Sequence, residues 1–291
     1  MTTTTRLAAL LSLGLVLALP GRALAIGSIT DGDVTFAYTT FAQGNNLTTR
    51  ANFTGAGPGD QVYENWWFFR VSGDSRETPF TAPTSEDYSL GNYATLDWAD
   101  MSSRGLFSAT LNIAVMDPGT GGNLFQEMVI TALGAVTLEI FHYADFEVGG
   151  SSGTDSASLV SSSPDIQISV SDGTNSVPWI GYGADAYKVT RYATNGNPRS
   201  IIMDLTDNGV DNMNNTGLPW APGDFTGAFQ WSLSLTAGQS VTLLSQWGAN
   251  APLLPPTSMP TPEPGSAVLM AIGLFGLGLM GRRARTQRPL R

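Results

Sequence analysis

The sequence predicts an all-β fold, an antiparallel two-sheet β-sandwich of jelly-roll type that spans residues 26–249. Three observations predict it. Apolar residues alternate with polar ones in several segments, and this period of two gives a strand one face for a core and one for water. Long stretches of helical periodicity are hard to find. Clusters of Gly, Asn, Asp, Ser and Pro separate the alternating segments, as turns do between strands.

The alternation is clearest in three segments, and weaker in several others. The clear segments are 107–115, 136–148 and 225–235, and the weaker ones are 34–41, 61–71, 124–130, 166–170, 186–192, 200–205 and 240–247. Roughly ten strands of this kind suit a two-sheet sandwich. Two segments rich in Gly, Ser, Asn and Pro, 149–163 and 207–223, are expected to be loops that could carry function.

Residues 1–25 have the pattern of a secretory signal peptide. One basic residue, Arg6, precedes an apolar run at 7–19, and Ala23 and Ala25 form the small-x-small pattern of a signal peptidase site. We expect cleavage by signal peptidase after export through the general secretion machinery, with Ile26 as the new N terminus. An uncleaved start is the alternative, although the apolar run is short for a membrane span.

The C-terminal end has three parts. Residues 250–264 are rich in proline and predict a semi-rigid linker. Residues 265–281 carry no charge and are apolar on all sides, which predicts a single transmembrane helix. The basic tail 282–291, with Arg282, Arg283 and Arg285, would stay in the cytoplasm and leave the body outside. An ordinary single-pass anchor and a buried C-terminal helix are the alternatives.

This end resembles a PEP-CTERM sorting signal. The resemblance rests on the triplet Pro262, Glu263 and Pro264, the short helix with Gly273, Gly276 and Gly278, and the arginine cluster, in that order. It implies that an exosortase recognises the triplet and cleaves near it, in a Gram-negative-type bacterium that makes exopolysaccharide. The protein would then enter the inner membrane through its C-terminal helix and reach the cell surface. The resemblance covers the tail alone.

Composition limits the partners of the body. Between Ile26 and Ser258 there are 7 basic residues and 23 acidic ones, so the net charge of this part is 7 − 23 = −16. Such a surface repels phosphate groups, so nucleic acid is not expected as a partner. The chain has no cysteine, which excludes disulfides and thiol chemistry.

No catalytic motif is predicted. His142 is the only histidine, and it falls on the apolar face of a predicted strand, where a core residue is expected. Residues 149–153 match Gly-x-Ser-x-Gly, but a nucleophile elbow needs a following helix and a later histidine, and both are missing.

A calcium site is a weak candidate in the segment that begins at Asp204. Oxygen side chains at Asp204, Asp207, Asn208 and Asp211, with a glycine at the sixth position, resemble part of a calcium loop. Asn215 stands where a bidentate glutamate is needed, so an EF-hand is excluded. The alternative is an ordinary turn, and apart from this ion no cofactor is expected.

Two adjacent tryptophans are weak candidates for binding sugar. Trp66 and Trp67 lie in a predicted strand and point to opposite faces, so one ring is exposed unless a second layer covers it. Core packing is the alternative.

From these observations we expect an exported protein that is not an enzyme, with a structural or adhesive role at the cell surface. Two alternatives stay open. One is a carbohydrate-binding module associated with exopolysaccharide, which predicts exposed aromatic residues. The other is a secreted hydrolase that uses two carboxylates, which the 23 acids of the body neither support nor exclude.

Overall fold

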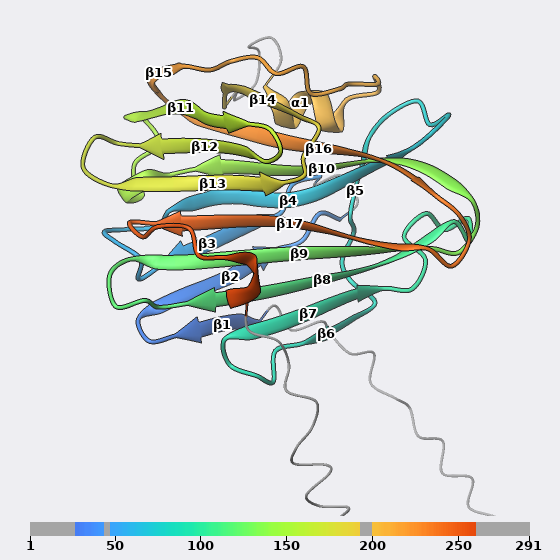
Figure 1. The fold of residues 1–291 in the computed structure, drawn as a ribbon, viewed down its shortest axis with the longest axis horizontal. Coiled ribbons are helices and arrows are strands. Elements are labelled where there is room, and N and C mark those ends of the chain that lie inside the picture. The colour runs from blue at the N-terminus through green and yellow to red at the C-terminus, as the bar shows by residue number, and fades with distance from the viewer. Residues whose placement is uncertain (1–26, 44–46, 193–199, 260–291) are drawn as a thin grey trace, which may run out of the picture.

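The computed structural model describes residues 27–43, 47–192 and 200–259, which form two stacked antiparallel β-sheets (Figure 1). The eight-stranded sheet has the order β1-β2-β3-β4-β10-β16-β14, and β5 pairs with β4. Its strands are β1 (Ser28–Asp31), β2 (Val34–Thr40), β3 (Arg50–Thr54), β4 (Val62–Val71), β5 (Thr78–Pro79), β10 (Val136–Phe146), β14 (Ala186–Arg191) and β16 (Phe225–Leu235).

The nine-stranded sheet has the order β15-β11-β12-β13-β17-β9-β8-β7-β6. Its strands are β6 (Ser85–Asp87), β7 (Tyr93–Trp98), β8 (Phe107–Met116), β9 (Gly122–Ala132), β11 (Asp155–Ser162), β12 (Ile166–Ser171), β13 (Ser176–Tyr182), β15 (Trp220–Gly223) and β17 (Ser240–Ala249). The described residues also contain three short helices, η1 (Val148–Gly150), α1 (Ile201–Thr206) and η2 (Pro256–Ser258).

The prediction of an all-β protein with two antiparallel sheets is confirmed. The three clearest segments are β8, β10 and β16, whose alternate residues fill the core. Residues 200–205, predicted as a strand, instead form α1, because the Ser200 side chain accepts a hydrogen bond from the Met203 amide and begins a helix. The predicted loop 149–163 contains β11, which forms through pairing with β12 although its Leu159 and Val160 are exposed.

Aromatic side chains fill the space between the sheets. The imidazole of His142 stacks on Trp67, with ring centroids 4.3 Å apart, and lies 6.3 Å from the ring of Trp247 in the other sheet. Burial lowers the pKa of His142 to about 3, so the ring is neutral at physiological pH. The His142 side chain is fully buried, which confirms the prediction that it is a core residue. Its Nε2 lies 2.8 Å from Nδ2 of Asn65.

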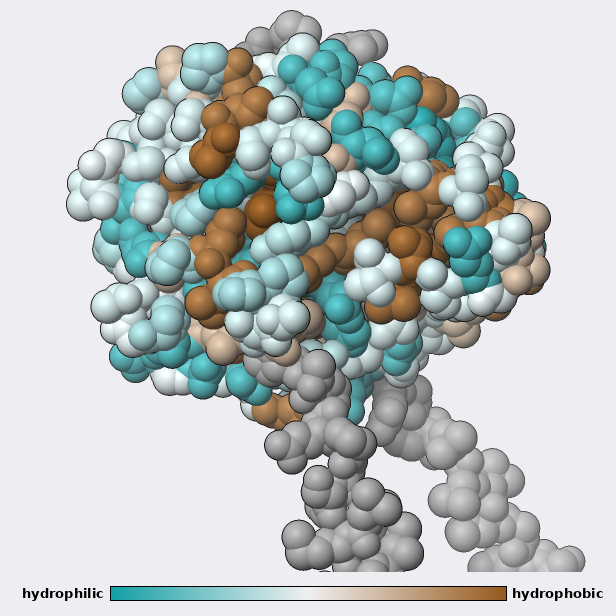
Figure 2. Space-filling view, viewed as in Figure 1, coloured by the Kyte–Doolittle hydropathy of each residue, from teal (hydrophilic) through white to brown (hydrophobic). Residues whose placement is uncertain are grey.

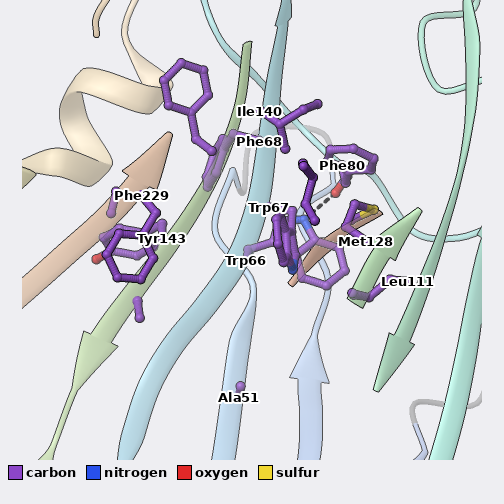
Figure 3. Close-up of a cluster of buried hydrophobic side chains, with 14 of the residues drawn as sticks. Ala51, Trp66, Trp67, Phe68, Phe80, Leu111, Met128, Ile140, Tyr143 and Phe229 are labelled. Carbon is purple, nitrogen blue, oxygen red and sulfur yellow. Dashed lines mark hydrogen bonds between the residues drawn. The ribbon is translucent and has the colours of Figure 1, made fainter. Parts of the chain in front are cut away.

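Neither Trp66 nor Trp67 offers a free ring face. Both are buried, and Figure 3 shows them within a cluster that includes Phe80 and Met128. The Trp66 indole donates a hydrogen bond to the carbonyl of Phe80, and its ring packs against Tyr38. A second layer thus covers both rings, and the weak prediction that they bind sugar finds no support in their placement.

The first part of the predicted linker packs on the outer face of the nine-stranded sheet. Leu254 and Met259 lie against a small cluster formed by Tyr93, Ala114 and Phe125. Figure 2 shows this face, where apolar patches alternate with polar ones. This part of the predicted linker therefore contacts the body through Leu254 and Met259.

Several predictions fall outside the described residues and stay predictions: the signal peptide at 1–25 with Ala23 and Ala25, the triplet Pro262, Glu263 and Pro264, the transmembrane helix at 265–281, and the basic tail at 282–291. Among the residues that the structure describes, no helix is long and apolar enough to cross a membrane.

Candidate functional site

A β-bulge marks one end of the eight-stranded sheet. Glu64 of β4 pairs with Asp145 of β10, and the next pair is Val62 with Phe146, so Tyr63 is an extra residue in β4. The Tyr63 ring meets the Tyr192 ring edge-on, with centroids 6.2 Å apart. Bulges often lie beside active sites, where they redirect side chains.

The side chains near this bulge point away from the space between the sheets. Successive residues of a strand point to opposite faces, and His142 and Ala144 face the space between the sheets, so Tyr143 and Asp145 lie on the other face of β10, where both are still buried. Glu64 shares their side, since the Tyr143 hydroxyl donates a hydrogen bond to its Oε2 at 3.3 Å. The outer face of β4 and β10 thus carries two carboxylates and a phenol side by side.

Three further acids surround this pair. We call the five residues Glu64, Asp145, Glu147, Asp155 and Asp224 the acidic cluster. Burial is the main cause that raises the pKa of each of them. The pKa of Asp155 rises to about 7, and that of Asp145 rises well above its usual range, because the other four acids also repel its charge. Protons are therefore held inside the cluster near neutral pH.

Two carboxyl oxygens of the cluster lack hydrogen-bond partners. Asp145 is 2% exposed and Asp155 is fully buried, and Oδ1 of each accepts no hydrogen bond. Buried polar atoms are usually satisfied, so unsatisfied ones call for an explanation. One explanation is a protonated carboxyl whose free oxygen binds a ligand. Groups with shifted pKa values are common at functional sites.

A pocket of about 410 Å³ lies near Asp155 and Asp224, although none of the five acids is among its lining residues. Its lining residues are Gly153, Arg191, Trp220, Ala221, Pro222 and Gly223. Asp224 follows Gly223 directly, and Asp155 pairs with Gly223 between β11 and β15. All seven tryptophans lie in the described residues, and Trp220 is the one that is not buried. The Trp220 ring therefore lines this pocket, close to the backbone that leads into Asp224.

A second pocket, of about 450 Å³, lies near the opposite end of β4. Arg104 and Asp74, which both line it, form a bidentate ion pair at 2.9 and 3.0 Å. Because these charges satisfy each other, this pocket is the weaker candidate.

The four residues of the calcium candidate are engaged with other groups. Asp204 forms an ion pair with Lys188, Asp207 accepts a hydrogen bond from the Gly209 amide, and Asn208 accepts one from Arg76. The amide of Asp211 donates to Glu77. Among the described residues, no three metal-ligating side chains lie close enough to hold one ion.

Sequence reasoning missed the acidic cluster. The 23 acids of the body are spread along the chain, and only strand pairing brings residues as distant as Glu64 and Asp145 together. One signal was available: Glu64 lies two positions before a run of four aromatic residues in a predicted strand, where an acid is unusual.

Comparison with known proteins identifies structures of similar fold but no family for this chain. No family model and no curated protein matches the chain. A bacterial glucoamylase complexed with acarbose has a similar structure, with 14% identity and a TM-score of 0.52 over 76% of this chain and 32% of that one. The chain thus spans about a third of the length of that enzyme.

Two further structures match 77% of this chain over nearly the full length of their own chains. They are a galactose mutarotase related enzyme from Lactobacillus acidophilus, with 7% identity and a TM-score of 0.47 over 77% and 97% of the chains, and a putative aldose 1-epimerase from Escherichia coli K12, with 8% identity and a TM-score of 0.44 over 77% and 98%.

These findings correct the expected function. We expected a structural or adhesive body that is not an enzyme, and the fold corrects this expectation, because it resembles part of a bacterial glucoamylase. The sequence predicted the sandwich but not its function, because alternation predicts strands and says nothing of what a sandwich binds.

Proposed function

We propose that the domain is a carbohydrate hydrolase that uses Glu64 and Asp145 as its acid–base pair. One observation carries the proposal: Asp145 is buried, has a carboxyl oxygen without a partner, and lies directly opposite Glu64 at a β-bulge. The fold shared with a glucoamylase supports it. Side chains directly opposite each other have Cβ atoms roughly 5 Å apart. Glycosidases in which the second carboxylate activates a water hold their two carboxyl groups about 6.5–9.5 Å apart, so the proposal requires the longer Glu64 side chain to turn away from Asp145 and leave room for that water.

The two carboxyls have different environments and hence different roles. Asp145 holds its proton, because its pKa is raised by burial and by the surrounding acids. It donates this proton to the bridging oxygen as the bond between that oxygen and the anomeric carbon breaks. Glu64 is the base: burial raises its pKa, but Arg50 and the hydroxyls of Thr48 and Tyr143 lower it, whereas the pKa of Asp145 is raised by burial and by the surrounding acids alike. It takes a proton from the water that adds to the anomeric carbon.

The test is release of reducing ends from a panel of polysaccharides by the full chain. D145N and E64Q should each lower the rate by at least about 100-fold, the lower end of the range for general acid or base catalysis. The control is D87N, which changes an exposed acid outside the cluster. Loss of activity in D87N as well, or full activity in D145N, would overturn the proposal.

A second candidate is carbohydrate binding without turnover. It is favoured by Trp220, the one tryptophan that is not buried, in a pocket of a size suited to a sugar. In that case glycans bind to the full chain, W220A loses the binding, and no reducing ends appear with any variant. Measured side by side, binding and release separate the two candidates.

The place of action is proposed from sequence alone. The signal peptide at 1–25 and the resemblance of the tail to a PEP-CTERM signal support an exported protein that signal peptidase and an exosortase process. Exopolysaccharide would then be within reach as a substrate.

A further inference from the structure

We propose that the site selects glycans with positively charged amino sugars over neutral ones. This inference rests on the proposed function, since it names the substrate class of the same site. Three independent features support it: the charge balance of the acidic cluster, two buried acceptors without donors, and a pocket with an aromatic wall.

The cluster contains more carboxyl groups than the described cations around it can pair with. Five carboxyls lie near one another, and among the described residues two cations act on them, Arg50 from β3 and Arg191 from β14. Two tyrosines, Tyr143 and Tyr192, add hydroxyls and no cation. In the part of the chain that the structure describes, none of the five acids forms an ion pair. The cluster therefore favours a cation at close range.

Two carboxyl oxygens of the cluster have no hydrogen-bond donor. Oδ1 of Asp145 and Oδ1 of Asp155 are buried without hydrogen bonds. An alkylammonium group brings three donors and one positive charge, so it can donate to the Asp155 oxygen and ionise that carboxyl, while Asp145 keeps the proton that the proposed cleavage uses and accepts from a sugar hydroxyl. A neutral hydroxyl brings one donor and no charge.

The ligand is larger than a metal ion. No three acids among the described residues are close enough to hold one ion, so an ion could not use the whole cluster. A glycan can, because it extends over several ångströms and carries several donors. The nearby pocket of about 410 Å³ offers the Trp220 ring and the backbone of Gly153 and Gly223 to a neighbouring sugar ring. Sugar rings present apolar C–H faces that pack on aromatic rings.

The experiment compares glucosamine oligomers with glucose oligomers of the same linkage and length, in calorimetric titrations of the E64Q full chain. The glucosamine oligomer should bind at least tenfold more tightly at low salt, and this ratio should fall as salt screens the charges. D155N, added to E64Q, should bring the ratio close to one, whereas D87N, added in the same way, should leave it unchanged.

The outcomes separate the two proposals. Equal affinity for both oligomers, or a preference that neither salt nor D155N changes, overturns the inference while the proposed function stands. If neither charged nor neutral glycans bind or are cleaved, the proposed function falls and this inference with it. The ratio of kcat/KM for the two oligomers, measured on the unsubstituted full chain, provides the same comparison if E64Q does not fold.

Discussion

Asp145 of β10 lies directly opposite Glu64 of β4, and both residues are 2% exposed. Two carboxyls so close and so buried cannot both carry charge at low cost, because each repels the other and neither is hydrated. The pairing register of β4 and β10 therefore forces one of the two carboxyls to keep its proton. This relationship links the fold to both the predicted stability and the proposed chemistry.

The stability of the protein should fall as the pH rises from about 4 to 7. The pKa of Asp155 is raised to about 7 in the folded state, so the folded chain binds this proton more tightly than the unfolded chain does. The stabilisation is complete below the unfolded pKa of about 3.9 and is lost as the pH rises through 7. Each such group contributes at most about 1.4 kcal/mol per pH unit.

Urea unfolding of the full chain at several pH values checks this prediction. The slope of unfolding free energy against pH should be negative between pH 4.5 and 7, and it should become smaller in D155N. A slope of zero in the unsubstituted protein, or the same slope in D155N, would contradict the account.

Sequence reasoning found the sheets and missed the site for a physical reason. Alternation is local, so β8 and β10 can be identified from neighbouring residues alone. The partner of a strand is not local: Glu64 meets Asp145 only through pairing of β4 with β10, and the bulge at Tyr63 decides which side chains share a face. Trp66 illustrates the same limit, because the cover provided by Phe80 and Tyr38 comes from other strands and loops.

Trp67 and Trp220 should respond to alanine substitution in opposite ways. Trp67 is fully buried, stacks on His142 and donates a hydrogen bond to Gln126, so W67A should cost about 3–5 kcal/mol of unfolding free energy. Trp220 lies at a pocket, so W220A should cost less than half as much and should weaken glycan binding. Denaturant unfolding and calorimetric titration of both variants check this. Equal losses of stability would mean that Trp220 is a core residue.

The ion pair between Lys188 and Asp204 should be a strong determinant of stability. The Asp204 side chain is fully buried and that of Lys188 is 16% exposed, so removal of the lysine leaves a buried carboxylate without its partner. K188M should cost about 3–5 kcal/mol, whereas K188M combined with D204L should recover part of the loss. Urea unfolding of the single and double variants measures both effects. The exposed pair of Arg104 and Asp74 is the control, and R104M should cost less than about 1 kcal/mol.

Tyr143 should be a positioning residue that affects the reaction through its hydrogen bond to Glu64. Its hydroxyl donates to Oε2 of Glu64 and favours the charged form of that carboxyl, which lowers the pKa of Glu64 against the effect of burial. Y143F removes this hydrogen bond, so the pKa of Glu64 should rise and the base should stay protonated up to a higher pH. The acidic limb of the profile of kcat/KM against pH should then move to higher pH, while activity at the plateau changes less. A uniform loss of activity at every pH would show that Tyr143 supports the fold of the site and does not tune its base.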